Sequence, residues 1–357
     1  MNPGGVSTPV PAHSRWGGFV VALIALLAVL LVSLAVTLGI GSVSVPADVV
    51  LQVVGRRMWL GDFPVTPLQD QIIWDLRLPR VLAAAAVGAG LAVCGAVLQS
   101  LTRNDLAEPY LLGISGGATV GAVAVIALGV GMGTLGGTVA LTFGAFVGAL
   151  GSLALVLLLA VGRAGTLPPT RVVLAGVAIG QICSAFTSLM VIMNGDQQAA
   201  RKVLAWTLGS FAGVRWESTG FLIAAALLGL VVALFFARDL DAMSFGEATA
   251  TSLGISVAGV RWALMVVTAL LTACLVSVVG AIGFVGLIVP HIVRFVSGPV
   301  HARLLPLSLV TGAILMVWSD TAARSLAPGQ EIPVGVVTAI IGSPFFVWLL
   351  RRARSDA

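Results

Sequence analysis

Five ionisable residues near the C-terminus interrupt an otherwise apolar, glycine-rich stretch: His291, Arg294, Asp320, Arg324 and Glu331. An ionisable side chain at the centre of a membrane helix costs about 2.5–3.5 kcal/mol even on a lenient insertion scale. Each of the five is therefore expected at a helix end, or facing protein or water, where its charge is available to bind something. This segment is the first place to look for function.

The composition indicates a membrane protein. Hydrophobic residues make up 59% of the 357 residues, charged residues make up 9%, and the mean hydropathy is +1.10. A soluble domain cannot bury so much apolar surface, and the apolar runs reach the roughly 20 residues that span a bilayer. The sequence predicts an all-α polytopic membrane protein. Its net charge of +5 is spread along the loops, which favours contact with anionic lipid headgroups and not nucleic-acid binding.

The chain divides into a short tail and one transmembrane domain. Residues 1–15, rich in Pro, Gly and Ser, are expected to form a disordered cytoplasmic tail, and residues 16–357 the single domain. About ten membrane helices are expected, at 17–40, 80–101, 110–130, 136–161, 171–193, 220–237, 261–279, 288–296, 304–323 and 334–350. The even number, with a basic C-terminus, favours both termini in the cytoplasm. A polar stretch at about 238–260 separates two of these spans.

No residue pattern indicates a metal site or an enzyme. Cys94, Cys183 and Cys274 lie within apolar runs, where they are expected to be small buried side chains. The three histidines are dispersed, and His301 is expected in a loop. A phosphate-binding P-loop requires a lysine after its last glycine, and the single lysine, Lys202, follows Arg201. We therefore expect no metal, no cofactor and no ATP hydrolysis by this chain. A membrane enzyme would need a paired acidic or histidine-rich site, which the sequence does not contain.

Glycine and proline interrupt one apolar run near the C-terminus. Gly280, Gly283 and Pro290 leave room for only a short helix after the break. Broken helices at membrane depth occur where they line a cavity or pack within protein. Elsewhere small residues recur at four-residue spacing, as at Gly144 and Gly148, which predicts close packing of helices.

Five separated motifs run in order through the chain. They are DLRLPR from Asp75, LTRNDLAEPYLLG from Leu101, GFVGLIVPHIVR from Gly283, DTAAR from Asp320 and EIPVG from Glu331. Together they resemble the FecCD family, the permease subunits of ATP-binding-cassette (ABC) importers for iron-siderophores, haem and cobalamin. The resemblance implies a type II ABC importer permease of ten helices. It also implies a homodimer or a pair with a close paralogue, ATP-binding subunits in the cytoplasm and a substrate-binding protein outside.

The resemblance assigns docking residues by position. Arg77, Arg80 and Arg324 match arginines that pair with glutamates on the two lobes of the binding protein, and the planar guanidinium suits a carboxylate partner. A structural role is the open alternative. In that interpretation Arg80 snorkels or caps a helix, and Arg324 pairs locally with Asp320.

The resemblance also assigns a cytoplasmic gate. Asn104 and Leu106 match gating positions in one cytoplasmic loop, and Pro169 and Thr170 match them in another. This chain departs from the family at Asp105, where proline is usual, so the shape and charge of its gate differ.

Coupling to the ATPase is implied for the polar insert at 238–260, at Glu247, Ala250, Leu253 and Gly254. A polar helix with Leu253 projecting and Gly254 ending it suits a groove on a soluble partner. The alternative is a solvated loop.

The resemblance therefore implies a permease in the bacterial inner membrane that moves a ferric siderophore, the family's commonest substrate, into the cytoplasm. A haem or cobalamin importer is the alternative within the class. An ion-coupled secondary transporter is the alternative from another class, and it would need an acidic residue or a broken-helix ion site within the membrane.

Overall fold

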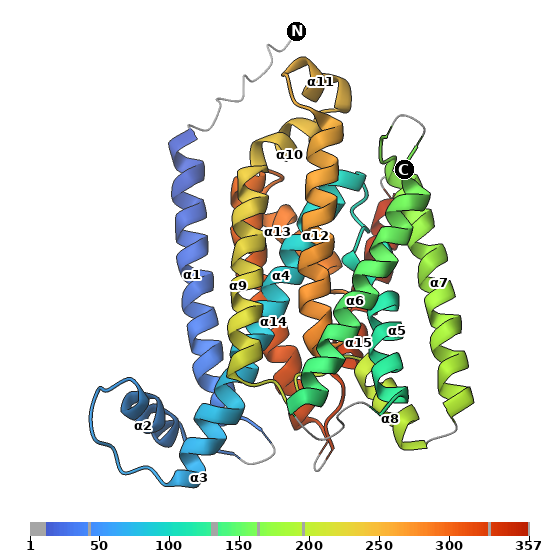
Figure 1. Ribbon diagram of the computed structural model, residues 1–357. Helices are drawn as coiled ribbons and strands as arrows, with labels where there is room; N and C mark the ends of the chain where they lie inside the picture. Colours follow the sequence, from blue (N-terminus) through green and yellow to red (C-terminus); the bar gives the residue numbers. More distant parts are fainter. Residues whose placement is uncertain are drawn as a thin grey trace.

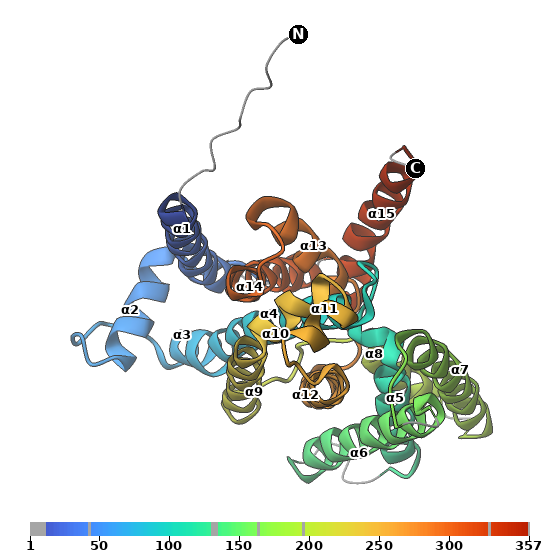
Figure 2. The same ribbon diagram turned by 90° about the horizontal axis from the view of Figure 1, so that it is seen from above.

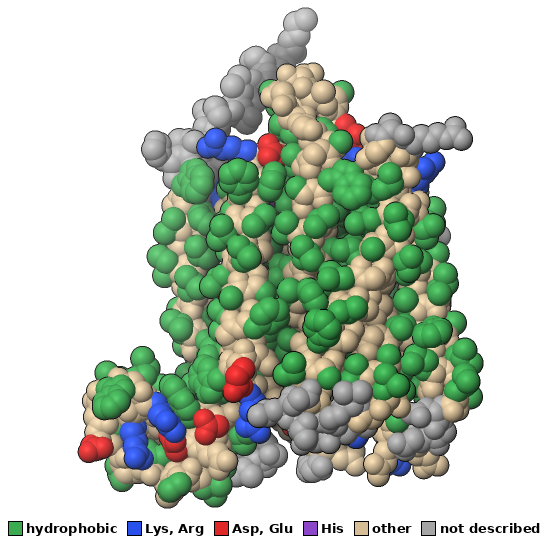
Figure 3. Space-filling view, viewed as in Figure 1, with side chains coloured by type: hydrophobic (Ala, Val, Ile, Leu, Met, Phe, Trp, Pro, Cys, Tyr) green, Lys and Arg blue, Asp and Glu red, His purple; other side chains and the backbone are tan. Residues whose placement is uncertain are grey.

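The computed structural model describes residues 12–41, 44–129, 135–162, 165–194, 197–327 and 330–355. Every regular element in these ranges is a helix, and the long helices run side by side from one end of the molecule to the other (Figure 1). On the face shown in Figure 3, hydrophobic side chains cover the middle of the bundle, and the coloured charges gather towards its two ends. This distribution matches a bilayer with an aqueous phase on either side.

Among the described residues, seven helical stretches are long and apolar enough to cross a membrane. They are α1 (Ala12–Gly39), the continuous α3 (Pro67–Asp70), η1 (Gln71–Arg77) and α4 (Leu78–Thr102), then α6 (Leu135–Ala160), α7 (Pro169–Asn194), α9 (Trp216–Phe235), α12 (Val257–Val279) and α14 (His301–Ser325). Three shorter apolar helices are α5 (Ile114–Ala127), α13 (Val285–Ser297) and α15 (Val334–Ser355). The seven and the three together confirm the ten helices predicted from the sequence.

The remaining helices lie at the two ends of the bundle (Figure 1). They are α2 (Ala47–Arg57), α8 (Gln197–Thr207), α10 (Ala237–Ser244) and α11 (Glu247–Ser252). The short 3₁₀ turn η2 (Pro109–Leu112) instead packs inside the bundle, against α4, α5, α7 and α12. We call the end that carries α2 and α8 the α2 end, and the opposite end, which carries α10 and α11, the α11 end. Helix α1 begins and α15 finishes at the α11 end.

Helix α4 occupies the centre of the bundle, with α9, α12, α13 and α14 around it (Figure 2). Its small residues allow this close packing. A Cβ atom on Gly88 would lie 2.2 Å from the carbonyl oxygen of Gly312 in α14, and one on Gly95 would lie 1.9 Å from that of Gly286 in α13. Gly144 and Gly148 of α6 likewise meet α5 backbone, as the small-residue spacing predicted.

Several boundaries differ from those expected. The helix expected at 80–101 begins at Pro67 and runs without a break to Thr102. Helix α5 covers 14 residues, not the span expected at 110–130, because Pro109 starts a 3₁₀ turn and Gly113, at a φ of 71°, ends it. Helix α13 begins at Val285, after a break that contains Gly280 at a φ of 76° and Phe284 at a φ of 71°. Helix α1 begins at Ala12, within the stretch expected as a tail, and the rest of that tail lies outside the described residues.

Candidate docking, gating and coupling sites

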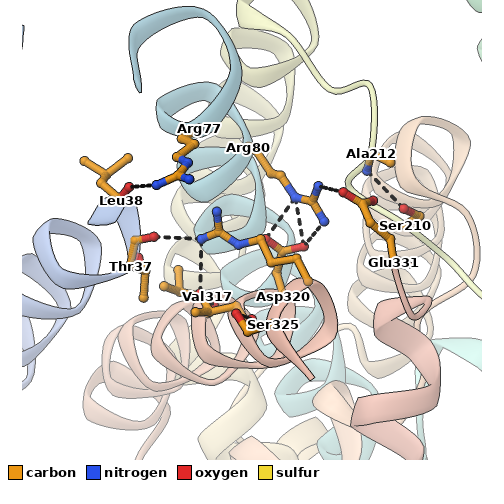
Figure 4. Close-up of polar contacts among 12 residues, drawn as sticks. Thr37, Leu38, Arg77, Arg80, Ser210, Ala212, Val317, Asp320, Ser325 and Glu331 are labelled. Carbon is orange, nitrogen blue, oxygen red and sulfur yellow. Dashed lines mark hydrogen bonds and ion pairs between the residues drawn. The ribbon is translucent and has the colours of Figure 1, made fainter. Parts of the chain in front are cut away.

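The three predicted docking arginines come together at the α2 end, on the continuous η1–α4 stretch and on α14, which are far apart in sequence. Arg77 is the last residue of η1, Arg80 lies in the first turn of α4, and Arg324 lies in the last turn of α14. Figure 4 shows Arg77 and Arg80 beside Asp320 of α14 and Glu331 of the following segment. The structure therefore gathers five charged side chains, three positive and two negative, into one cluster, which we call the arginine cluster.

Arg80 is held by two carboxylates. Its Nε lies 3.1 Å from both oxygens of Asp320 and its Nη2 lies 2.8 Å from Oδ1, while Nη1 donates to Oε1 of Glu331 at 2.8 Å. Asp320 is 1% exposed, whereas the Glu331 side chain is 50% exposed. Arg80 therefore has one partner buried in the protein and a second that is open to water. The alternative in which Arg80 caps a helix does not hold, because its guanidinium donates to these two carboxylates.

Arg77 and Arg324 hold the end of α1. Arg77 Nη1 donates to the carbonyl oxygen of Leu38 at 2.7 Å (Figure 4). Arg324 Nη2 donates to the carbonyl oxygen of Thr37 at 2.8 Å. The last carbonyl groups of a helix have no partner within it, so cationic donors there stabilise the helix end. Arg324 Nε also lies 3.6 Å from Asp320, which is the local pair raised from the sequence. Both arginines are largely buried, so docking through them stays a prediction.

The first predicted gating loop is a tight turn directly after α4. Arg103 ends that helix in the left-handed conformation, with a φ of 49°. The Asn104 side chain then accepts a hydrogen bond from the backbone N–H of Leu106 at 3.0 Å. Asp105, the departure from the family pattern, pairs with Arg294 Nη1 of α13 at 2.7 Å. In this chain an ion pair therefore ties the gate loop to the broken helix.

The second pair of predicted gating residues, Pro169 and Thr170, starts α7 at the same α11 end (Figure 1). Proline suits the first position of a helix because its missing N–H has no partner there anyway. Both predicted gating segments thus lie at the end opposite the arginine cluster, on the side that carries α10 and α11.

The predicted coupling residues lie on and beside α11, and their exposures differ. Leu253 is 68% exposed, and Gly254, at a φ of 83°, lies directly beyond the helix end, as expected. Ala250 is fully buried, so it holds α11 to the rest of the chain and does not itself face a partner. Phe245, which the sequence analysis did not single out, is 78% exposed just before α11. The α10–α11 tip thus presents two apolar side chains to water.

Glu247 anchors α11 to the bundle. Its Oε1 accepts a hydrogen bond from Arg261 Nη2 of α12 at 2.8 Å. This hydrogen bond lowers the pKa of the Glu247 carboxyl, so the pair is ionised at neutral pH and is lost only as the pH falls through that lowered pKa. Glu247 therefore stabilises the position of the coupling segment against α12.

Sequence reasoning missed one polar cluster at the α11 end. His301, expected in a loop, is the first residue of α14 and is 3% exposed. Its partner is Asp241 of α10, which the sequence analysis had treated only as part of the polar insert. A polar residue directly before a long apolar run is a helix-start signal, and it was the available clue.

Taken together, a ten-helix apolar bundle with an exposed polar insert at one end and an ion-paired cluster at the other defines a polytopic membrane transport protein. The chain matches the FecCD transport family over residues 24–352 and belongs to that family. It is therefore a permease subunit of an ABC importer and not an enzyme, because ATP hydrolysis in these systems is done by a separate subunit. The family match decides against the ion-coupled secondary transporter.

Known proteins resemble the chain over most of its length. It is 41% identical over 291 residues to the cobalamin import system permease protein BtuC of Halobacterium salinarum, covering 81% of this chain and 76% of the relative. It is 37% identical over 343 residues to the iron(3+)-hydroxamate import system permease protein FhuB of Bacillus subtilis, covering 96% and 85%. A solved structure described as an inward-facing metal-chelate type ABC transporter superposes with a TM-score of 0.79 at 32% identity, covering 92% and 98%.

Proposed function

We propose that this permease imports a preformed metal chelate, and specifically a ferric siderophore. The observation that carries the proposal is membership of the FecCD family, with relatives named for an iron(3+)-hydroxamate and for cobalamin and a structural neighbour of the metal-chelate type. In each named substrate an organic ligand already surrounds the metal. A pathway that passes such a complex needs shape and an apolar lining more than metal-coordinating side chains.

Cobalamin is the second candidate, because one relative at 41% identity is named for it. We favour the siderophore because the iron(3+)-hydroxamate permease matches 96% of this chain. Identity between permeases is a weak guide to the substrate where the binding protein selects it.

Uptake by reconstituted vesicles tests the substrate. With its ATPase inside and its binding protein outside, the permease is expected to accumulate a labelled ferric hydroxamate only when ATP is present on the ATPase side. Vesicles that contain a non-hydrolysing ATPase variant are the control. Uptake of cobalamin without ferric hydroxamate would contradict the siderophore assignment, and uptake without any ATPase subunit would contradict the importer mechanism.

We further propose the orientation and the assembly. The predicted docking cluster and the predicted coupling segment lie at opposite ends of the bundle, which suits a binding protein outside the cell and ATP-binding subunits inside (Figure 1). The α11 end would then face the cytoplasm, with both termini, in a bacterial inner membrane. A second permease subunit, identical or paralogous, would complete the pathway.

When the binding protein docks, Arg80 would exchange one of its carboxylate partners for a carboxylate of the binding protein. Glu331 is half-exposed and holds Nη1 of Arg80, so a glutamate of the binding protein would replace it while Asp320 keeps the other side of the guanidinium. The remaining positive charges of the cluster would attract an acidic surface over a distance, in a salt-dependent manner.

The Glu331→Gln variant tests this exchange without disturbing the end of α1. It is expected to lower the concentration of binding protein that gives half-maximal ATPase stimulation by about two- to fivefold, the range for one exposed ion pair. Glu217→Gln, which removes an exposed acid at the start of α9, is the matched control. Weaker docking of the binding protein to the Glu331→Gln variant, or docking that does not respond to salt, would contradict the proposed replacement of Glu331 at Arg80.

A further inference from the structure

His301 joins three helices at the α11 end. Its backbone N–H donates to Oδ1 of Asp241 in α10 at 2.9 Å, and its ring Nδ1 lies 2.6 Å from the same oxygen. Its Nε2 lies 2.6 Å from Oγ of Ser100 in α4. One buried imidazole at the start of α14 therefore connects the coupling segment to the central helix.

The hydrogen atoms available restrict how these contacts are made. The Ser100 hydroxyl also lies 3.1 Å from the carbonyl oxygen of Ala96, and it has one hydrogen to donate. If that hydrogen goes to Ala96, Nε2 must donate to Ser100, while Nδ1 must donate to the Asp241 carboxylate, which accepts only. The Ser100 hydrogen can equally go to Nε2, and in either arrangement both ring nitrogens have a partner. The hydrogen bond to the Asp241 carboxylate is charge-assisted, and such bonds are shorter and stronger than neutral ones.

Ser100, His301 and Asp241 are linked in the same order as the residues of a hydrolase triad, but the serine oxygen is placed differently. A hydrolase serine presents its oxygen to a substrate. Here Oγ of Ser100 is held between the His301 ring and the Ala96 carbonyl of its own helix. The arrangement suits a mechanical connection between helices.

A second contact runs parallel to the first. Arg103, the residue that ends α4, donates from Nη2 to the carbonyl oxygen of Met243 in α10 at 3.2 Å. The predicted gate residues Asn104 and Leu106 follow directly. A displacement of α10 that left α4 and α14 in place would leave Nδ1 of the buried His301 ring without its carboxylate partner and would break the Arg103 contact. The three helices are therefore expected to move together.

We propose that His301 is a positioning residue that transmits displacement of the α10–α11 segment to α4, and through α4 to the gate loop. The inference depends on the proposed docking of the ATPase at the α10–α11 tip. It assigns His301 no contact with the substrate or with the ATPase. Its effect is on how much transport each hydrolysed ATP produces.

Two substitutions test the two ring contacts of His301 separately. His301→Asn keeps an amide nitrogen near the position of Nδ1 and loses the reach to Ser100, whereas His301→Gln reaches further and loses the fit to Asp241. Both are expected to lower the amount of chelate transported per ATP by at least about fivefold, the lower end of typical coupling between sites. The ATPase is expected to co-purify at the wild-type yield. The readout is labelled chelate and released phosphate in the same reconstituted vesicles.

Ser100→Ala and Thr102→Val provide the matched comparison, because both remove a hydroxyl from the last turns of α4. Thr102 Oγ1 donates only to the carbonyl of Leu98 in its own helix among the contacts of the described chain, whereas Ser100 reaches His301. Ser100→Ala is expected to lower transport per ATP and Thr102→Val to leave it unchanged. The Ser100→Ala/His301→Asn double variant is expected to be no worse than His301→Asn alone, since residues of one network are not additive.

The possible outcomes distinguish a failure of this inference from a failure of the proposed ATPase docking at the α10–α11 tip. Unchanged transport per ATP in both His301 variants would overturn the transmission role, and so would loss of the ATPase from them, because His301 would then be an assembly residue. An ATPase that stays bound to a Leu253→Asp permease would instead overturn the docking site. Equal effects of Ser100→Ala and Thr102→Val would also count against transmission through His301.

Discussion

Replacement of Leu253 by aspartate is expected to release the ATPase from the permease and abolish ATP-driven transport. Leu253 is 68% exposed at the tip of α11, where an apolar side chain has no role in the bundle itself. If this side chain fills a pocket on the ATPase, aspartate places an unpaired carboxylate there and removes an apolar anchor. Losing such a central anchor costs about 2 kcal/mol or more, which weakens association by roughly 30-fold or more. Co-purification of the ATPase with the tagged permease measures the effect.

A second variant on the same short helix tests whether an added negative charge alone releases the ATPase. Thr251→Asp adds one carboxylate at an exposed position of α11, and it is expected to reduce co-purification far less than Leu253→Asp. Leu253→Met keeps an apolar side chain of similar volume and is expected to retain the ATPase. Wild-type recovery of the ATPase with Leu253→Asp, together with full transport, would show that α11 is a solvated loop and not the coupling element.

Removal of Arg80 is expected to unfold the permease at much lower temperature. Arg80→Met leaves Asp320, which is 1% exposed, without the guanidinium that donates to both of its oxygens. Breaking a buried pair on one side costs about 3–5 kcal/mol, because a buried charge is left uncompensated. Arg324 Nε at 3.6 Å offers partial compensation, so we expect the lower part of that range. Thermal unfolding of the purified permease in detergent gives the measurement.

Two further variants show whether burial is the cause. Glu331→Gln removes the half-exposed partner and is expected to cost at most about 1 kcal/mol. The Arg80→Met/Asp320→Leu double variant replaces both buried charges with apolar groups and is expected to regain most of the stability lost in the single variant. A single Arg80→Met variant as stable as wild type would mean that the pair is no more than a surface contact.

The membrane class, the number of apolar helices and the family follow from the amino-acid sequence. Whether a segment crosses a bilayer depends on its own length and apolarity, because each membrane helix satisfies its backbone hydrogen bonds internally. The break before α13 was also predictable, since Gly280 ends α12 locally, whereas Pro290 lies inside α13 and does not cause the break. The shortness of α5 had a local cause as well, in Pro109 and Gly113, but apolarity alone did not show it.

The partners of the polar groups were decided by the tertiary structure. Arg80 and Asp320 are 240 residues apart in sequence, and Arg324 reaches the end of α1 across 287 residues. Which polar atoms meet depends on how helices of similar apolarity pack, and that packing depends on small-residue contacts such as Gly88 with Gly312. For the same reason the sequence placed His301 in a loop. Its burial exists only because α10, α4 and α14 converge there, and only the folded chain places the Asp241 carboxylate within reach of the imidazole.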